Sequence, residues 1–141
     1  MSLPSTEDIV EDMEFFDDWE DKYKYIIDLG KSLPAFDDEW RTAERLVKGC
    51  QSNVWIQPDS YQDNVAGEVL SFAVDSDAII VRGLLGLVMA AYDKKTPEQV
   101  LAFDINQYFS DLDLERHLSP TRGNGLRSIV ARIQSIAQAA A

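Results

Sequence analysis

The stretch AIIVRGLLGLVMAAY, residues 78–92, most constrains what this chain can fold into. Arg82 is its one charged residue, and the segment from Gly83 to Tyr92 is uncharged. A helix that is apolar nearly all round must be covered by protein on most sides. The run is too short to span a bilayer, so we expect a central, buried helix. Gly83 and Gly86 would let another element approach that helix closely.

Capping residues and apolar periodicity predict further helices on both sides of this segment. Ser5 and Ser119 can each cap a helix, and the TPEQ tetrapeptide from Thr96 has the form of a capping box with proline at the first helical position. The polar run DSD at 75–77 offers N-caps for the central helix. The expected helical ranges are 5–16, 19–30, 78–92, 96–103, 112–118 and a last helix from 120 into the alanine-rich end.

Two β-prone segments precede the central helix. Residues 54–56 form a short apolar run that we expect to end near Pro58, and residues 59–64 predict a polar turn. Residues 65–74 place apolar side chains on one face of a second strand. These segments predict an antiparallel hairpin. With helices before and after it, the fold class is α+β, a small antiparallel sheet packed against helices.

The length of 141 residues and the hydrophobic content of 45% suit one domain with a proper core. Cys50 is the only cysteine, so no internal disulfide can form, which fits a reducing compartment. The acidic start lacks the basic and apolar segments of a secretory signal. We therefore expect a cytoplasmic protein that has no membrane span.

Charge is unevenly spread along a chain whose net charge is −12. The segment from Glu7 to Asp21 holds nine acids and no lysine or arginine, whereas residues 116–141 hold four arginines, one histidine and no acid. A chain this acidic repels phosphate backbones, so we do not expect nucleic acid as a partner. Each run is either a solvated helix face or a surface that steers a charged protein partner.

Several chemistries are excluded by the residues that are missing. The sequence has no phosphate-binding loop and no dinucleotide fingerprint. One cysteine and one histidine cannot build a cysteine-rich zinc site or hold an iron–sulfur cluster within one chain. We therefore expect no metal and no bound cofactor. His117 could serve Cys50 as a base in a hydrolase-like dyad, although a lone histidine is more often a helix-end or surface residue.

Cys50 is the remaining candidate for chemistry. A single cysteine is often a small buried hydrophobe, and this alternative stays open. However, Gly49 and the tripeptide 51–53 are loop formers, which places the thiol where a loop enters a strand and can reach another molecule. Lys48 and Arg45 would favour the nucleophilic thiolate form.

Four motifs occur in a fixed order along the chain, and together they resemble the SufE family, which includes CsdE. The resemblance covers residues 36–136 and implies a single SufE-like domain over 1–141, whose acidic helices at about 5–33 match only in character. It also implies a fold shared with iron–sulfur scaffold proteins of the IscU kind. The motifs are GCQSNVW at 49–55, DSDAIIVRGL at 75–84, TPEQVLAFD at 96–104 and HLSPTRGNGL at 117–126.

The resemblance implies a sulfur acceptor for a cysteine desulfurase of the SufS type. Cys50 would take sulfur from the persulfide of that enzyme, stimulate its turnover and pass the sulfur to a scaffold complex containing SufB. Pyridoxal phosphate would belong to the desulfurase, and the carrier, a monomer when free, would catalyse nothing alone. A CsdE-like carrier serving a CsdA-type desulfurase is the nearest alternative; a cluster scaffold and a cysteine hydrolase are the others.

The resemblance also implies roles for residues around Cys50. Gly49, Gln51 and Ser52 flank it, Asp77 would act as a latch on the loop, and Arg122 would contact the partner or the substrate site. Each of the last two has a rival role, because Asp77 can cap a helix and Arg122 can pair with a local carboxylate. Many relatives carry serine at the position of Gly123. Since the resemblance weakens in the acidic N-terminal helices, we expect them to lie outside the surface that docks the desulfurase.

Overall fold

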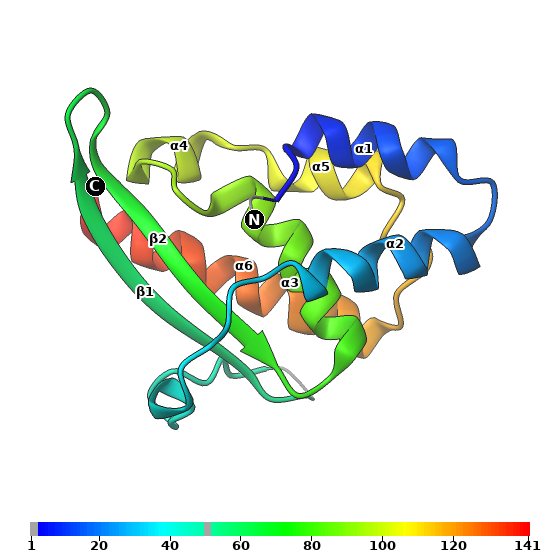
Figure 1. Ribbon diagram of the computed structural model, residues 1–141, viewed down its shortest axis with the longest axis horizontal. Helices are drawn as coiled ribbons and strands as arrows, with labels where there is room; N and C mark the ends of the chain where they lie inside the picture. The colour runs from blue at the N-terminus through cyan, green and yellow to red at the C-terminus, as the bar shows by residue number, and fades with distance from the viewer. Residues whose placement is uncertain (1–2, 50–51) are drawn as a thin grey trace.

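The computed structural model of the protein describes residues 3–49 and 52–141 (Figure 1). The predicted nucleophile Cys50 and its neighbour Gln51 lie outside the described residues. In chain order the elements are α1 (Thr6–Phe15), α2 (Trp19–Lys31), the 3-10 helix η1 (Asp38–Trp40), β1 (Val54–Asp63), β2 (Gly67–Ser76), α3 (Ile79–Tyr92), α4 (Pro97–Ala102), α5 (Ile105–Asp111) and α6 (Pro120–Ala140).

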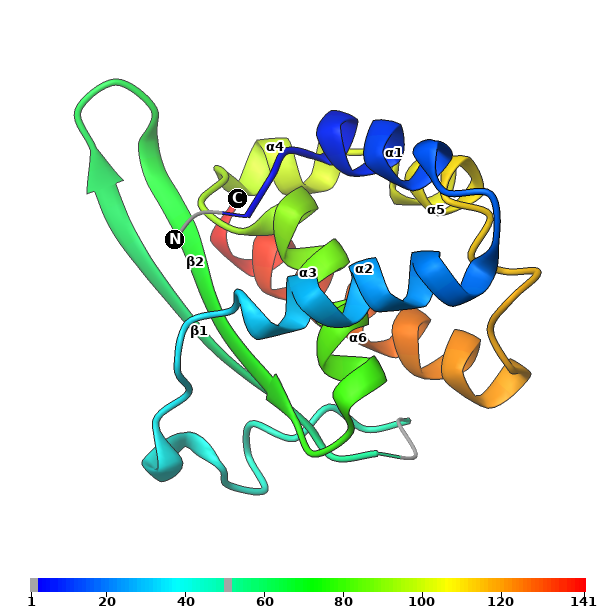
Figure 2. The same ribbon diagram turned by 45° about the vertical axis from the view of Figure 1, so that its right-hand side comes forward.

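The molecule has two layers, a long hairpin and a group of α-helices that covers one face of it. Figures 1 and 2 both show β1 and β2 along one side, with α3, α4 and α6 next to them and α1 farther away. The hairpin buries alternate side chains against these helices in a single core, which includes Val54, Ile56, Leu70, Phe72 and Val74. The predicted α+β class, with a small antiparallel sheet packed against helices, is confirmed.

The hairpin itself is longer than the sequence pattern indicated. The strands pair antiparallel from Val54 opposite Ser76 to Asp63 opposite Gly67. The antiparallel pairing is confirmed, but the expectation that the first strand ends near Pro58 is wrong, because residues 59–63 continue β1.

Proline is tolerated inside β1 because of how its pair is bonded. Pro58 lies opposite Phe72, whose N–H donates to Asp93 Oδ1 at 2.9 Å instead of to β1. A proline disrupts a strand because it has no N–H to donate to the neighbouring strand. Alternate pairs of an antiparallel ladder exchange no backbone hydrogen bonds, and Pro58 lies at such a pair, so no hydrogen bond is lost.

The turn of the hairpin lies at residues 64–66, just beyond Asp63. Asp63 Oδ1 accepts the N–H groups of Val65 and Ala66 at 2.8 and 2.9 Å. These two hydrogen bonds to the ionised form hold the pKa of the Asp63 carboxyl below its usual range. Gly67 then begins β2 with a φ of +86°, a left-handed conformation that favours glycine.

The central helix α3 meets α2 main chain to main chain. A Cβ atom added at Gly83 would lie 2.6 Å from the carbonyl oxygen of Ile26, and one added at Gly30 would lie 2.7 Å from the nitrogen of Gly83. At Gly86 the corresponding distance, to Leu29 Cβ, is 3.1 Å. The expected close approach at the two glycines of α3 is confirmed, and Gly30 supplies the matching position on α2.

The acidic N-terminal helices are part of the core rather than an appendage. Ile9 and Met13 of α1 have exposed fractions of 0% and 2%, and Ile26 and Leu29 of α2 are buried in the same cluster. The acids of α1 and α2 therefore occupy the outer faces of helices whose inner faces are apolar.

The helix starts were predicted well where a side chain caps its own helix. Ser5 Oγ and Ser119 Oγ accept the N–H groups of Asp8 and Arg122, and the capping box at Thr96 is complete. The N-cap prediction for α3 is wrong, because Ala78 holds that position without a side-chain hydrogen bond.

The segment before α6 was also predicted wrongly. Residues 112–118 form turns, and the helix is α5, seven residues earlier in the chain. Asp104 Oδ1 accepts the N–H of Gln107 and caps the start of α5. Asp113, with a φ of +57°, lies in the left-handed region just after the helix, where helical geometry cannot continue.

We expect Gly83→Ala to destabilise the fold by about 1–3 kcal/mol, because the added methyl group would overlap the main chain of α2. Gly123→Ala is the matched control: it lies inside α6, and beyond its own helix turn an added Cβ would meet no described atom within 4 Å. The control should be neutral or gain up to about 1 kcal/mol. Urea denaturation would measure both, and wild-type stability of Gly83→Ala would contradict the proposed contact.

Candidate functional site

Two hydrogen-bonded segments close the loop that carries the predicted nucleophile. Val47 N–H donates to Val54 O at 2.8 Å, and Ile56 N–H donates to Arg45 O at 3.0 Å. The chain therefore leaves the end of the hairpin after Val47 and returns to the same place at Val54. This location agrees with the prediction of a loop that enters a strand.

Gly49 occupies a position that only glycine suits. Its φ is +95°, and an added Cβ would lie 2.6 Å from Ser128 Oγ on α6. Another residue would be strained by the left-handed backbone, and the Ser128 side chain would have to move to accommodate its Cβ. The residue before Cys50 therefore lies close to α6.

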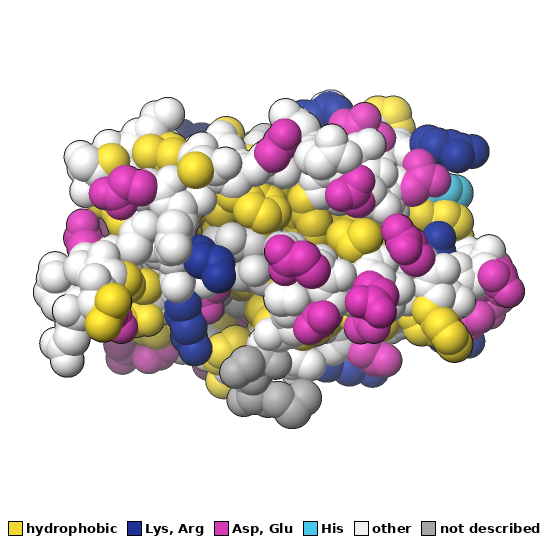
Figure 3. Space-filling model, turned by 90° about the horizontal axis from the view of Figure 1, so that it is seen from above, with side chains coloured by type: hydrophobic (Ala, Val, Ile, Leu, Met, Phe, Trp, Pro, Cys, Tyr) yellow, Lys and Arg dark blue, Asp and Glu magenta, His cyan; other side chains and the backbone are white. Residues whose placement is uncertain are grey.

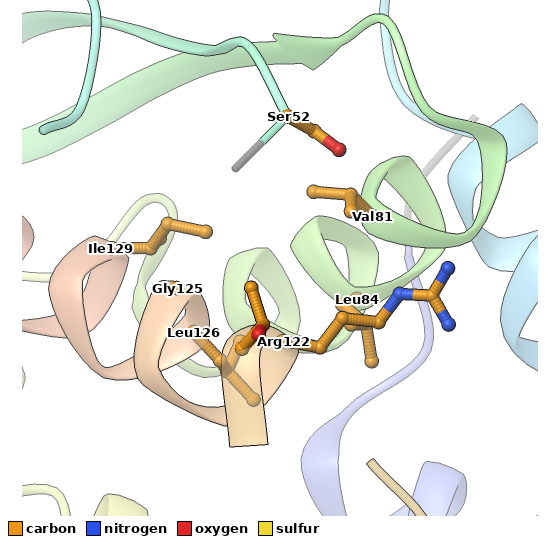
Figure 4. Close-up of a pocket in the computed structure, with 8 residues that line it drawn as sticks. Ser52, Val81, Leu84, Arg122, Gly125, Leu126 and Ile129 are labelled. Atoms are coloured by element: carbon orange, nitrogen blue, oxygen red, sulfur yellow. The ribbon is translucent and has the colours of Figure 1, made fainter. Parts of the chain in front are cut away.

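Ser52, on the other side of Cys50, borders a cavity between α3 and α6. Figure 4 shows Val81 and Leu84 of α3 facing Leu126 and Ile129 of α6 across this space, with Ser52 at its edge. The cavity measures about 500 Å³, its open mouth included. Most of its wall is apolar, and the lining residues are Ser52, Val81, Leu84, Thr121, Arg122, Gly125, Leu126 and Ile129.

Asp77 is bonded to the returning arm of the loop. Its Oδ1 accepts the main-chain N–H of Asn53 at 3.1 Å, and its Oδ2 accepts Asn53 Nδ2–H at 3.0 Å. The N–H of Asp77 donates in turn to Asn53 O at 3.3 Å. The rival role of Asp77 as the cap of α3 is wrong, because its carboxylate is engaged with Asn53 instead.

Arg122 lies in the first turn of α6, at the border of the cavity, and is exposed. Its main-chain N–H donates to Ser119 Oγ at 3.3 Å. None of the ion pairs among residues 3–49 and 52–141 involves its guanidinium, so the rival role as the partner of a local carboxylate finds no support there.

Sequence reasoning missed an ion-pair cluster around the buried carboxylate of Asp75. Asp75, whose side chain is 8% exposed, binds Arg41 Nη2 at 2.8 Å and Arg82 Nη2 at 2.7 Å. The Arg41 guanidinium also lies over the ring of Trp55, 5.5 Å from its centroid. The cluster joins the segment entering the loop, β2 and α3. The available signal was Arg82 itself, because a charge on a buried helix needs a partner.

His117 is engaged away from the loop. Its ring stacks on Trp19 at 3.9 Å, its Nε2 lies 3.6 Å from Asp113 Oδ2, and its carbonyl accepts the hydroxyl of Tyr23 at 2.6 Å. These contacts belong to α2 and to the turns before α6. The hydrolase-like dyad with Cys50 stays a prediction that no described contact supports.

Within residues 3–49 and 52–141, no three histidine, aspartate or glutamate side chains come together as a metal site. No helix in that part of the chain is both long and apolar enough to cross a membrane. The predicted absence of a cofactor stays a prediction.

Comparison with known proteins gives a consistent family match. The family model described as "SufE: Fe-S metabolism associated domain" matches residues 7–137, which includes nearly all of α1 and the whole of α2 and so extends beyond the range of the motifs. An uncharacterized SufE-like protein of Rhizobium etli is 44% identical over 96% of this chain and 91% of its own length. Another, of Rhizobium meliloti, is 40% identical over 96% of both chains.

A solved structure has the same fold. The solution structure of a hypothetical protein from Thermus thermophilus matches with a TM-score of 0.76, covering 99% of this chain and 98% of that one. The two sequences are 18% identical, so this likeness concerns the fold alone.

We expect Asp77→Ala to release Asn53. Loss of a hydrogen bond to a carboxylate should speed hydrogen exchange at the Asn53 amide about tenfold or more. Asp93→Ala is the matched control, since it removes a comparable bond to Phe72 on β2. NMR-detected exchange of both amides would measure this, and an Asn53 amide unchanged in Asp77→Ala would show that the carboxylate does not restrain the loop.

Proposed function

The chain belongs to the SufE family, whose role is sulfur transfer in iron–sulfur metabolism, and from this premise we propose that Cys50 accepts sulfur from the persulfide of a cysteine desulfurase. The observation that carries the proposal is the anchoring on both sides of Cys50. Gly49 is packed against α6, and Asn53 is bonded to Asp77. A reactive thiol that is exchanged between proteins needs such a held but accessible position.

The proposed reaction is an exchange at sulfur. The Cys50 thiolate attacks the terminal sulfur of the partner's persulfide, a new sulfur–sulfur bond forms on Cys50, and the old bond breaks. The partner's cysteine leaves as a thiolate, so no external oxidant or reductant is needed. Since Cys50 is the only cysteine, the new persulfide cannot be resolved into an internal disulfide.

The described surroundings suit this chemistry. Lys48 is exposed and lies two residues before Cys50, and Arg122 borders the nearby cavity. Positive charge favours a thiolate or a persulfide anion over the neutral form. In this proposal the apolar cavity between α3 and α6 shelters the persulfide from water between acceptance and delivery.

We also propose how the desulfurase docks. Ile79, in the first turn of α3, is 61% exposed and follows the Asp77 bond to the loop by two residues. Together with the guanidinium of Arg122, it offers an apolar and a charged contact on the same side as the loop. A SufS-type donor and a SufB-type acceptor fit this proposal, and a CsdE-like role with a CsdA-type desulfurase uses the same chemistry.

Sulfur acceptance can be tested by intact-mass spectrometry after mixing the chain with the cysteine desulfurase of its own genome and free cysteine. We expect wild type to gain one sulfur atom on Cys50 and Cys50→Ser to gain none. A variant combining Cys50→Ser with Ser60→Cys moves the thiol to the exposed part of the hairpin and should also gain none. Equal loading of the displaced thiol, or no loading of wild type, would overturn the carrier role.

The docking residues can be tested by titrating the carrier against desulfurase turnover. Ile79→Asp and Arg122→Ala should each raise the half-saturating carrier concentration about tenfold, as truncating a central interface contact does. Leu101→Asp is the matched control, because Leu101 is 40% exposed on α4, at the other end of α3 (Figure 1). The proposed surface is wrong if the control is as impaired as the two site variants.

A further inference from the structure

A second surface lies in the groove between α1 and α5, which the proposed sulfur chemistry does not use. The groove measures about 740 Å³, the space at its open side included. Val10, Phe103 and Tyr108 form its floor. The hydroxyl of Tyr108 is turned inward, where it donates to Leu87 O at 3.0 Å, so the ring contributes only apolar surface. Figure 3 shows the hydrophobic strip in this hollow, between acidic side chains on both sides.

Acids line the rim of the groove from both helices. Glu7 lies on α1, Asp111 lies on α5 and Asp104 caps α5. Their hydrogen-bond partners are neighbours in the chain: Thr6 for Glu7 and Gln107 for both aspartates. No lysine or arginine in the described part of the chain forms an ion pair with any of these three carboxylates.

Six carboxylates elsewhere in the described structure have a lysine or arginine partner. Asp75 binds two arginines, and Asp113 and Glu115 each bind one. Along α1 the negative charges are instead left together, and like charges held close together repel one another and oppose the compact state. Binding a positively charged partner would relieve that repulsion, whereas an anionic membrane or nucleic acid would increase it.

These features select one kind of occupant. We propose that the α1–α5 groove binds a basic amphipathic helix of a partner protein, which places apolar side chains on the groove floor and lysine or arginine against the rim. The groove lies on another side of the molecule from the start of β1 and the start of α3, as Figures 1 and 2 both show. The partner can therefore bind while the loop of Cys50 is docked to a sulfur donor, and its binding does not depend on sulfur acceptance.

The probe for this proposal is a synthetic amphipathic helix with leucine on one face and lysine on the other. Its matched control carries glutamate in place of lysine. Fluorescence anisotropy should show that the lysine peptide binds at least about tenfold more tightly and that its binding weakens with added salt. NMR shifts should concentrate at Val10, Phe103 and Tyr108. Equal affinity of the two peptides, or shifts spread over the whole acidic surface, would overturn the proposal.

Two charge variants distinguish an effect of the groove carboxylates on peptide affinity from an effect of the net charge of the protein. The groove variant combines Glu7→Gln, Asp104→Asn and Asp111→Asn, with asparagine keeping the cap of α5. The control variant combines Asp59→Asn, Glu68→Gln and Glu98→Gln, which changes the net charge equally at sites outside the groove. We expect the groove variant to lose about tenfold in affinity for the lysine peptide, as three weak ion pairs would contribute, and the control to lose about twofold or less.

Two further measurements show whether the groove variant is folded and whether its sulfur acceptance is intact. Thermal unfolding should show the groove variant at least as stable as wild type, because like-charge repulsion has been removed. Its Cys50 should still accept sulfur from the desulfurase at the wild-type rate. Equal weakening of both charge variants would mean non-specific attraction and overturn the groove, and loss of sulfur acceptance in the groove variant alone would overturn the independence of the two surfaces.

Discussion

The contact between the main chains of α2 and α3 is the constraint on which the placement of the proposed site depends. Gly30 and Gly83 bring the two helices so close that α3 has little freedom to slide or rotate against α2. Arg82 precedes Gly83, and from this position its guanidinium reaches Asp75 at the end of β2. The short connection between β2 and α3 contains Asp77. The ion pair of Asp75 fixes its β2 end, and the contact of Gly83 with α2 fixes its α3 end. The tie between Asp77 and the Cys50 loop thus rests on a glycine contact deep in the helical layer.

Features of the fold could be predicted from the sequence where the residues that determine them are close together in the chain. Ser5, Ser119 and the box at Thr96 cap helices that begin within three residues of them, so their sequence signals were sufficient. Pro58 was misjudged because its tolerance depends on the register of the hairpin: it falls at a pair whose partner residue, Phe72, directs its N–H to Asp93 and not to β1. The start of α3 was misjudged for the same reason, since Asp77 bonds to a residue far from it in sequence.

The same distinction between local and distant determinants applies to the residues of the candidate site. Gly49 could be recognised beside the cysteine because a glycine in a loop motif is a local feature, although its contact with Ser128 was not predictable. The motifs around 75–84 and 117–126 were found by resemblance, and the structure brings Val81 of the first and Arg122 of the second to one cavity. The Arg41–Asp75–Arg82 cluster was missed because its members come from three segments whose proximity only the fold creates.

The distribution of charge connects the two proposed surfaces. Negative charge near a thiol disfavours the thiolate, so the role proposed for Cys50 is favoured when most of the acids of this chain lie away from it. Here many of the acids lie on the outer faces of α1 and α2, whereas the residues near the loop include Lys48 and Arg122. Two carboxylates do lie close to the loop: Asp75 is neutralised by two arginines, and Asp77 accepts two hydrogen bonds from Asn53. Screening in physiological salt confines the field of exposed charges to about 8 Å. In the proposed mechanism, acids on another side of the molecule have little effect on the Cys50 thiolate, and in the proposed groove they attract a positively charged partner.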